Sequence, residues 1–286
     1  MTDTQSDLLV IGGGSAGLAL AIRAARHGAK VTLFEPQELG GTCVNRGCVP
    51  KKAMWLAAEL SRMQALAVEI GFASRPGALD WPAFVERREA YIARARQAYA
   101  RRLEEYGVRI VAAHAQFVDA HTLEAANALY RAPHIAIATG SRPRVLDLPG
   151  AQLGIDSDGF FKLRECPRRI GIVGGGYIAV ELAGVLRALG AEVELFSRSR
   201  LLSHFDADMG DALCAAMDEQ GIVQHGQCAV RGALRERDDL WLDCADHARH
   251  GPYDQIVWAV GRVPNTDSLG LEAAGVRLDG DGNVVT

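Results

Sequence analysis

The sequence predicts an α/β protein made of two similar units, each built around a parallel sheet. Three observations carry this prediction: a glycine-rich segment occurs twice, each copy reads as strand, turn, helix and strand, and a second repeated strand follows each copy. The chain has 286 residues, of which 49% are hydrophobic and 23% charged. This length and composition suit a globular chain of about two domains.

The composition also excludes several classes of protein. The first seven residues are polar without a positively charged segment, and no apolar run approaches the roughly 18 residues of a membrane span. The formal net charge is -4 and no basic block stands out. We therefore expect a cytoplasmic protein with neither a membrane nor a nucleic-acid partner. The six cysteines form no C-x-x-C pair, so we also expect no metal site.

The main repeat relates residues 10–35 to residues 172–197. VIGGGSAGLALAIRAARHGAKVTLFE recurs as IVGGGYIAVELAGVLRALGAEVELFS. In each copy a short apolar run precedes the glycines, apolar residues then recur at helical spacing, and a glycine separates the helix from a second apolar run. Each copy is therefore predicted to be a βαβ unit of a Rossmann-like domain.

The first copy has the pattern of a dinucleotide-binding turn. Gly12, Gly14 and Gly17 follow a strand and open a helix, and Glu35 ends the second strand. In such turns the backbone N–H groups and the helix N-terminus hold a pyrophosphate, while the acid binds a ribose hydroxyl. A glycine-rich turn without a ligand is the alternative. The strand, the helix and the acid at the expected distance favour a site for an unphosphorylated adenosine ribose.

The second copy differs from the first at two positions. Gly174 and Gly176 keep the turn, but Ala179 stands for the third glycine. Ser197 replaces the acid, and Arg198 follows it directly. A small hydroxyl beside an arginine can bind the 2′-phosphate that a carboxylate would repel. The second copy is therefore predicted to bind NADP. The alternative is that the arginine is a solvated charge on a loop.

A second repeat follows each βαβ unit and indicates the domain boundaries. Residues 134–143 (HIAIATGSRP) resemble residues 255–264 (QIVWAVGRVP), and both read as apolar strands that end at a glycine turn. Residues 81–106 read as a helix before the first returning strand. We expect a first domain over residues 1–140, a second over 141–264, and the start of a third segment over 265–286.

Two cysteines lie directly after the first βαβ unit, in LGGTCVNRGCVPKKAMW (residues 39–55). Cys43 and Cys48 are five positions apart and precede a helix-compatible run with two lysines. Two reduced structural thiols are the alternative. Beside a dinucleotide site a cytosolic pair is usually catalytic, and a helix start with nearby lysines favours the thiolate. The pair therefore predicts a redox-active dithiol that exchanges with a substrate disulfide.

These residues resemble the active-site signature of a known family. GGTCVNRGCVPKK is similar to the signature of the FAD-dependent pyridine nucleotide-disulfide oxidoreductases. Residues 47–52 resemble its glutathione and trypanothione reductase branch, and residues 53–55 and 154–161 are typical of glutathione reductases. The resemblance covers essentially the whole chain in the family's order. It implies a flavoprotein oxidoreductase of glutathione metabolism and cell redox homeostasis, a homodimer in its full-length form, with FAD and NADPH as cofactors and glutathione disulfide as substrate.

The resemblance also implies a division of labour among the site residues. Electrons pass from NADPH through FAD to the Cys43–Cys48 disulfide, where Cys48 faces the flavin and Cys43 attacks glutathione disulfide. Tyr177 covers the flavin until the nicotinamide enters, and Lys51 pairs with Glu181 near the flavin's reactive nitrogen. Three further positions, each equally readable as helix surface, match the glutathione pocket: Ser15, Arg23 and Tyr99. The positions implied for cofactor binding are Gly12, Gly14, Ser15, Gly17, Glu35, Gly41, Thr42, Lys51, Thr139, Gly140, Gly174, Gly176, Tyr177, Ala179, Glu181, Arg198, Arg200, Gly261 and Arg262.

The sequence departs from the family's pattern at two positions within these motifs. Arg46 stands where the family usually has valine, and its guanidinium either favours a thiolate or points to solvent. Ser203 stands where a second arginine for the 2′-phosphate is expected, and Arg200 is the candidate substitute.

The third departure concerns the end of the chain. The family continues with a second FAD-binding segment and a dimerisation domain bearing a His-Pro motif, but none of the eight histidines here precedes proline. In the family that histidine protonates the leaving thiolate, a contribution of about 10²–10⁴-fold. We therefore expect a C-terminally truncated enzyme that lacks the dimerisation domain. The alternatives are a non-catalytic remnant that binds NADPH and FAD, and a reductase of another low-molecular-weight disulfide.

Overall fold

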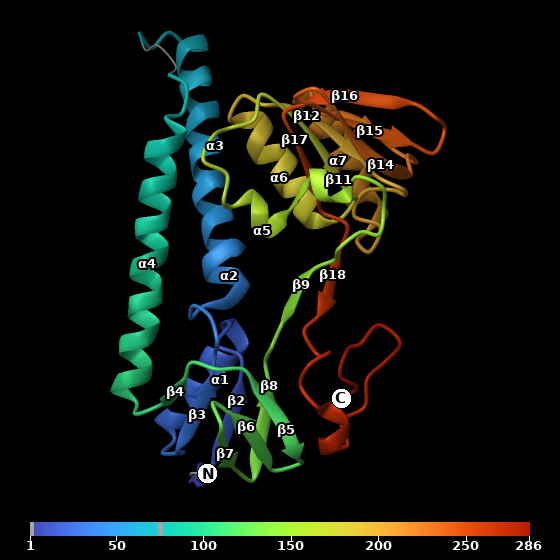
Figure 1. The fold of residues 1–286 in the computed structure, drawn as a ribbon. Helices are drawn as coiled ribbons and strands as arrows, with labels where there is room; N and C mark the ends of the chain where they lie inside the picture. Colours follow the sequence, from blue (N-terminus) through green and yellow to red (C-terminus); the bar gives the residue numbers. More distant parts are fainter. Residues whose placement is uncertain (1–2, 74–76) are drawn as a thin grey trace. The chain divides into compact units, whose positions relative to one another are not determined.

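The computed structural model describes residues 3–73 and 77–286, which form two compact units (Figure 1). Unit 1 comprises Met1–Pro50, Glu89–Arg142 and Arg262–Thr286, and unit 2 comprises Lys51–Arg88 and Pro143–Gly261. The chain passes between the units partly within two helices, α3 (Cys48–Glu69) and α4 (Trp81–Glu105). Each unit has its own parallel sheet, so the predicted α/β class with two Rossmann-like halves is confirmed.

The parallel sheet of unit 1 has the order β4-β3-β2-β8. Its central strands are almost entirely apolar and the structure buries nearly all of their residues, as expected for a sheet covered on both faces. One face packs under α1, where Leu18 and Ile22 contact Val10 and Leu33. The strands are β2 (Leu8–Ile11), β3 (Val31–Phe34), β4 (Arg109–Val111) and β8 (His134–Ile137), and the helix is α1 (Ser15–Arg26).

A second sheet covers the other face of unit 1. Leu9, Ile11 and Phe34 point away from α1 and pack against Phe117 and Leu123 of this sheet. The alternation follows from the period of two along a strand, which sends neighbouring side chains to opposite faces. The sheet has the order β1-β7-β6-β5, from β1 (Asp3–Gln5), β5 (Ala115–Asp119), β6 (Thr122–Ala125) and β7 (Ala128–Arg131), with the short helix η2 (Leu271–Ala274) beside it.

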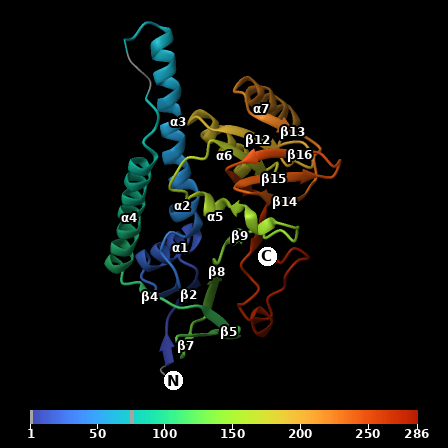
Figure 2. The ribbon, with the colours of Figure 1, turned by 45° about the horizontal axis from the view of Figure 1, so that its top comes forward.

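Unit 2 repeats the same plan around the parallel sheet β10-β17-β11-β12-β13. Ile170, Ile172 and Leu195 pack in a cluster with residues of α6 and α7, whereas Val173 and Phe196 pack with residues of an antiparallel meander, β14–β16. The labels β14, β15 and β16 mark the meander in Figures 1 and 2. The strands are β10 (Ile155–Asp156), β11 (Arg169–Val173), β12 (Glu192–Phe196), β13 (Val223–His225), β14 (Val230–Glu236), β15 (Asp239–Cys244), β16 (Arg249–Tyr253) and β17 (Gln255–Trp258). The helices are η1 (Ala151–Leu153), α5 (Ser157–Phe160), α6 (Tyr177–Ala188) and α7 (Ala207–Glu219).

Three smaller features complete the fold. Strands β9 (Ser141–Pro143) and β18 (Arg262–Pro264) pair with each other. A disulfide joins Cys228 to Cys244 in unit 2, a pairing that the sequence analysis did not anticipate. No helix among residues 3–73 and 77–286 combines the length and the apolar composition needed to cross a membrane.

Candidate functional site

The first glycine turn of unit 1 lies between β2 and α1 and is closed by steric contact. Gly12 has a φ of 107°, and a β-carbon there would lie 2.3 Å from the carbonyl oxygen of Ala138. A β-carbon on Gly17 would lie 1.8 Å from the Gly12 carbonyl oxygen, so only glycine lets α1 pack onto the turn. On Gly14 the nearest atom to such a carbon is the Gly41 Cα at 3.9 Å, an ordinary contact distance, so the turn is less crowded at this residue.

The helix end of the turn fits a pyrophosphate. No side chain caps the N-terminus of α1, so the first N–H groups of the helix are available to an anion. Glu35 follows β3, and its carboxylate accepts hydrogen bonds of 2.8 Å from the N–H groups of Gly13 and Gln37. The acid is thereby held against the turn, where a dinucleotide's ribose is expected.

The cysteine segment is fastened to this same turn. The N–H of Gly40 donates to the Gly13 carbonyl at 2.8 Å. The Asn45 side-chain amide donates to the carbonyls of Leu39 (3.2 Å) and Gly41 (3.0 Å) and so closes α2 (Gly41–Arg46) onto the preceding loop. Asn45 was not among the predicted site residues, because a side-chain amide that holds a loop has no sequence motif of its own.

Cys43 and Cys48 lie on consecutive helices, and both are thiols in the structure. Cys43 is half-buried on α2, and Cys48 is exposed at the first residue of α3. A helix N-terminus stabilises negative charge, which suits a thiolate at Cys48. Arg46, between the two cysteines, donates from Nη2 to the Gln37 side chain at 2.8 Å.

Residues from the two returning segments of unit 1 gather beside Thr42. The Arg262 guanidinium donates to the Ser141 hydroxyl at 2.9 Å and lies 3.5 Å from the Thr42 hydroxyl oxygen. Asn265 donates from its side chain to the Thr139 carbonyl at 2.9 Å.

The same asparagine also donates its backbone N–H to the Gly140 carbonyl, at 2.9 Å. Asn265 therefore holds both residues of the Thr139-Gly140 pair, another role without a sequence signal. Gly261, the last residue of unit 2, is exposed just before β18.

The glycine turn of unit 2 has the geometry of the first turn. Gly174 has a φ of 146°, and a β-carbon there would lie 2.2 Å from the Ala259 carbonyl oxygen. A β-carbon on Gly12 would clash with the Ala138 carbonyl oxygen in the same way. Around Gly176 nothing lies within 4 Å of such a carbon, and α6 begins without a side-chain cap. Ala179 is fully buried. This turn also fits a dinucleotide pyrophosphate.

Tyr177 and Glu181 belong to the first turn and a half of α6. Tyr177 begins the helix and is 55% exposed, so its ring is available to a ligand. Glu181 accepts from the Lys51 ammonium at 2.5 Å. Both partners of this ion pair lie in unit 2, on α6 and α3.

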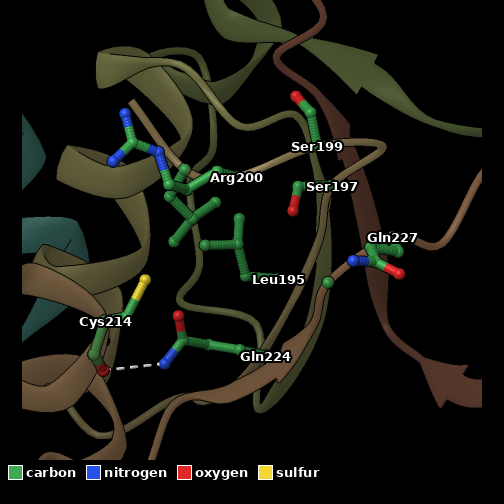
Figure 3. Close-up of a pocket in the computed structure, with 9 residues that line it drawn as sticks. Leu195, Ser197, Ser199, Arg200, Cys214, Gln224 and Gln227 are labelled. Carbon is green, nitrogen blue, oxygen red and sulfur yellow. Dashed lines mark hydrogen bonds between the residues drawn. The ribbon is translucent and has the colours of Figure 1, made fainter. Parts of the chain in front are cut away.

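A pocket of about 270 Å³ opens beside the loop that follows β12 (Figure 3). Ser197 and Ser199 line one side of it, together with Gln227. The Arg200 guanidinium is directed away from both serines and donates to the Phe205 carbonyl at 3.4 Å. Arg198 is exposed on the same loop. Arg200 is among the residues that line the pocket, whereas Arg198 is not.

The other cysteines with a thiol group are poor candidates for redox chemistry. Burial raises the pKa of Cys166. Burial, followed by the carboxylates of Asp211 and Asp218, raises the pKa of Cys214, which lines the pocket beside Ser197. Both thiols therefore resist conversion to the nucleophilic thiolate.

The three residues suggested for a substrate pocket all belong to unit 1. Ser15 begins α1 and is exposed, and Arg23 is exposed in the last turn of the same helix. Tyr99 on α4 is half-buried and packs against the apolar cluster beneath α1. Part of the Tyr99 ring therefore has a packing role.

Comparison with known proteins places these features in context. Residues 6–286 match the family model of the pyridine nucleotide-disulphide oxidoreductases. The glutathione reductases of Schizosaccharomyces pombe and Yarrowia lipolytica are 42% and 39% identical over 98% and 97% of this chain. The chain spans 62% and 63% of the length of these two relatives.

A solved structure gives a similar result for the fold. The HOCl-induced flavoprotein disulfide reductase RclA from Escherichia coli superposes with a TM-score of 0.85 at 27% identity. The match covers 98% of this chain and 62% of that one. The Cu(II) complex of the same reductase gives a TM-score of 0.87 at 26% identity, over 99% of this chain and 62% of that one.

Proposed function

Because the chain belongs to the pyridine nucleotide-disulphide oxidoreductase family, we propose that it serves an NADPH-dependent, FAD-containing reductase of glutathione disulfide. One observation carries the proposal: the Cys43–Cys48 segment is hydrogen-bonded through Gly40 to Gly13 of the first nucleotide turn. This attachment sets a pair of exchangeable thiols beside a site suited to a redox dinucleotide. The chain spans 62–63% of the length of its curated relatives, so the activity of the whole protein is proposed as well.

The residues present fit both cofactors. The Gly12–Gly17 turn, Glu35 and the Thr139–Gly140 pair would hold FAD, and the Gly174–Ala179 turn with Ser197 would hold NADPH. When bound, the flavin supplies a two-electron carrier between the nicotinamide and a disulfide. Arg198 would bind the 2′-phosphate of NADPH through charge-assisted hydrogen bonds. NADH has no 2′-phosphate and could not form them.

The cysteines would carry out the exchange with the substrate. The Cys43 thiolate attacks one sulfur of glutathione disulfide, the substrate S–S bond breaks, and the first glutathione leaves as a thiolate that takes up a proton. Cys48 then attacks the Cys43 sulfur of the mixed disulfide and releases the second glutathione. The dithiol loses two electrons, the substrate gains two, and the Cys43–Cys48 disulfide formed is reduced again by the two electrons of one NADPH.

The position of Cys48 supports its part in this sequence. As the first residue of α3 it lies at the positive end of the helix dipole, which stabilises a sulfur anion. Cys43 follows the exposed Thr42 on α2 and is half-buried, so a small disulfide can reach it. Neither thiol is buried, so both can take part in exchange, and the helix start at Cys48 favours the thiolate of the resolving group.

A test begins with the colour of the purified chain. Bound flavin makes the protein yellow, and NADPH should bleach it. Cys43→Ser should keep the colour and the bleaching but lose glutathione disulfide-dependent oxidation of NADPH. Cys166→Ser is the matched control and should retain activity, because the raised pKa of Cys166 keeps its thiol unreactive.

Other outcomes would redirect the proposal. Turnover retained in Cys43→Ser would remove Cys43 from the mechanism. A colourless chain that still binds NADPH would favour the non-catalytic nucleotide-binding alternative. Turnover with another small disulfide, and none with glutathione disulfide, would change the substrate while keeping the cysteine chemistry.

A further inference from the structure

Three side chains of metal-ligating type meet on the meander face of unit 2, on strands that carry no part of the glycine turn. They are Glu194 on β12, His225 on β13 and His250 on β16, and one ligand atom from each lies within 4.8 Å of the others. The Nε2 of His225 is 2.8 Å from Oε2 of Glu194, and the two imidazole centroids are 4.3 Å apart. We propose that these residues form a binding site for a divalent transition ion of the Zn²⁺ type.

The register of the parallel sheet brings two of these ligands together. Phe196 pairs with His225 and Glu194 with Gly171, so all four residues lie on the face that the meander covers. A β-carbon on Gly171 would lie 3.0 Å from the Tyr253 ring. The missing side chain therefore makes room for the end of β16.

The meander then delivers the third ligand. His250 lies on β16 three residues before Tyr253, and its ring stacks edge-on against Phe196, with centroids 5.1 Å apart. Phe196 also stacks face to face on His225, at 4.4 Å. One aromatic ring thus holds both imidazoles in place, so the donor atoms are ordered before an ion arrives.

The fold itself does not require metal-ligating residues at these positions. By the internal repeat, Thr32 in unit 1 corresponds to Glu194, and by the register Val111 corresponds to His225, since each pairs with the equivalent phenylalanine. Thr32 is buried with its hydroxyl 2.9 Å from that of Ser6, and Val111 is buried in an apolar cluster. Unit 1 therefore packs the same face without metal-ligating groups.

The surroundings of Glu194 also suit a ligand role. Its other carboxylate oxygen lies 3.7 Å from the Arg169 guanidinium, which orients the group so that Oε2 faces the Nε2 of His225, and an ion would take the place of the hydrogen bond between them. The Tyr253 hydroxyl is buried beside Glu194 without a well-aligned hydrogen-bond partner among the described residues. Such a hydroxyl is ready to bond a water or hydroxide on the ion.

The donor set selects the class of ion. Two imidazoles and one carboxylate favour Zn²⁺, Co²⁺, Ni²⁺ or Cu²⁺ over Mg²⁺ and Ca²⁺, which prefer oxygen alone. Tetrahedral bonds of about 2.1 Å place ligand atoms about 3.4 Å apart, so small side-chain rotations suffice to close the site. The Glu194 and His225 side chains are 21% and 23% exposed, which gives an ion a path from solvent.

A zinc titration tests the proposal in a chain without the reactive dithiol. In a Cys43→Ser/Cys48→Ser parent, competition with a chromogenic zinc chelator should report one Zn²⁺ per chain, unaffected by excess Mg²⁺. His250→Gln should weaken this binding by at least about tenfold, since loss of an outer partner alone typically costs 10–100-fold. His134→Gln, an exposed histidine on β8, is the matched control and should bind as the parent does.

Two results would overturn the proposal. One is a parent that binds no Zn²⁺, and the other is equal binding by His250→Gln and His134→Gln. If His250→Gln shows no cooperative thermal transition, the spectrum of Co²⁺ on the folded parent decides. Bands of nitrogen and oxygen ligation without a thiolate charge-transfer band support the site, and an unchanged aqueous Co²⁺ spectrum contradicts it.

Discussion

Gly41 packs so closely on Gly14 that a β-carbon at position 41 would lie 2.7 Å from the Gly14 Cα. The first residue of the cysteine helix and Gly14 of the nucleotide turn are therefore in backbone contact. A neighbouring hydrogen bond, from Gly40 to Gly13, acts in the same direction. The cysteine helix can lie this close to the turn because Gly41 has no side chain.

We expect Gly41→Ala to disturb this contact. Gly41 has a φ of 56°, so alanine would cost about 1–2 kcal/mol in the backbone and about 1–3 kcal/mol more from overlap with Gly14. Chemical denaturation and the flavin content after purification measure the effect. Gly107→Ala is the control, because Gly107 has a φ of 66° with nothing within 4 Å. Equal loss in both variants would show that the contact with Gly14 has no effect of its own.

The Lys51–Glu181 pair should matter more for electron transfer than for stability. Its side chains are 30% and 39% exposed, so the pair should contribute only about 0.2–1 kcal/mol to unfolding. If the ammonium stabilises negative charge that arrives at the flavin, Lys51→Met should slow bleaching by NADPH by about 100-fold.

The neighbouring lysine provides the control for this measurement. Lys52 is exposed, and its ammonium lies 3.4 Å from the centroid of the Trp55 ring. Stopped-flow traces of Lys52→Met should therefore match those of the parent. Equal slowing in the two variants would count against a specific role of Lys51.

The choice between NADPH and NADH should depend on Arg198. Loss of charge-assisted hydrogen bonds costs about 1.5–3 kcal/mol, so Arg198→Ala should lower kcat/KM for NADPH by about 10–100-fold and leave that for NADH unchanged. Arg200→Ala should have a smaller effect, because its guanidinium donates to the Phe205 carbonyl. Steady-state kinetics with both nucleotides measure this. Equal kcat/KM for the two nucleotides in the parent would refute the role of Arg198.

The Cys228–Cys244 disulfide should stabilise unit 2. The two cysteines are 16 residues apart, and closing a loop of that size contributes about 3 kcal/mol through the unfolded chain. A Cys228→Ser/Cys244→Ser variant should therefore unfold at lower denaturant concentration, by about 2–4 kcal/mol. A reductant should shift the parent toward the variant and leave the variant itself unmoved. A variant as stable as the oxidised parent would contradict this assignment.

Features with a local signal in the sequence were predicted well. The glycines of both turns, the strands before them and the helix at Trp81–Glu105 all follow from spacing within a short stretch of chain. The Lys51–Glu181 pair joins residues that are 130 positions apart, and it was expected only through resemblance to a family.

Features made by distant strands had no such signal. Glu194, His225 and His250 meet only because β16 folds back over β12 and β13, and no sequence motif connects them. The expectation of no metal site was based on the spacing of the cysteines alone. The Cys228–Cys244 bond likewise requires the register of the meander. The side chains of Asn45 and Asn265 donate to backbone carbonyls. Every residue has a backbone carbonyl, so the sequence does not indicate which one is bound.

Because α1 and α6 start without a side-chain cap, a nucleotide bound at each start would become a structural component of its own unit. A pyrophosphate there does what a serine or aspartate cap does in other helices, so the bound cofactor completes the helix. A ligand at 100 times its Kd adds about 2.7 kcal/mol to the stability of the unit that holds it. The two units have separate apolar clusters, so each should respond to its own cofactor. FAD should raise the melting temperature of unit 1, and NADPH should raise that of unit 2.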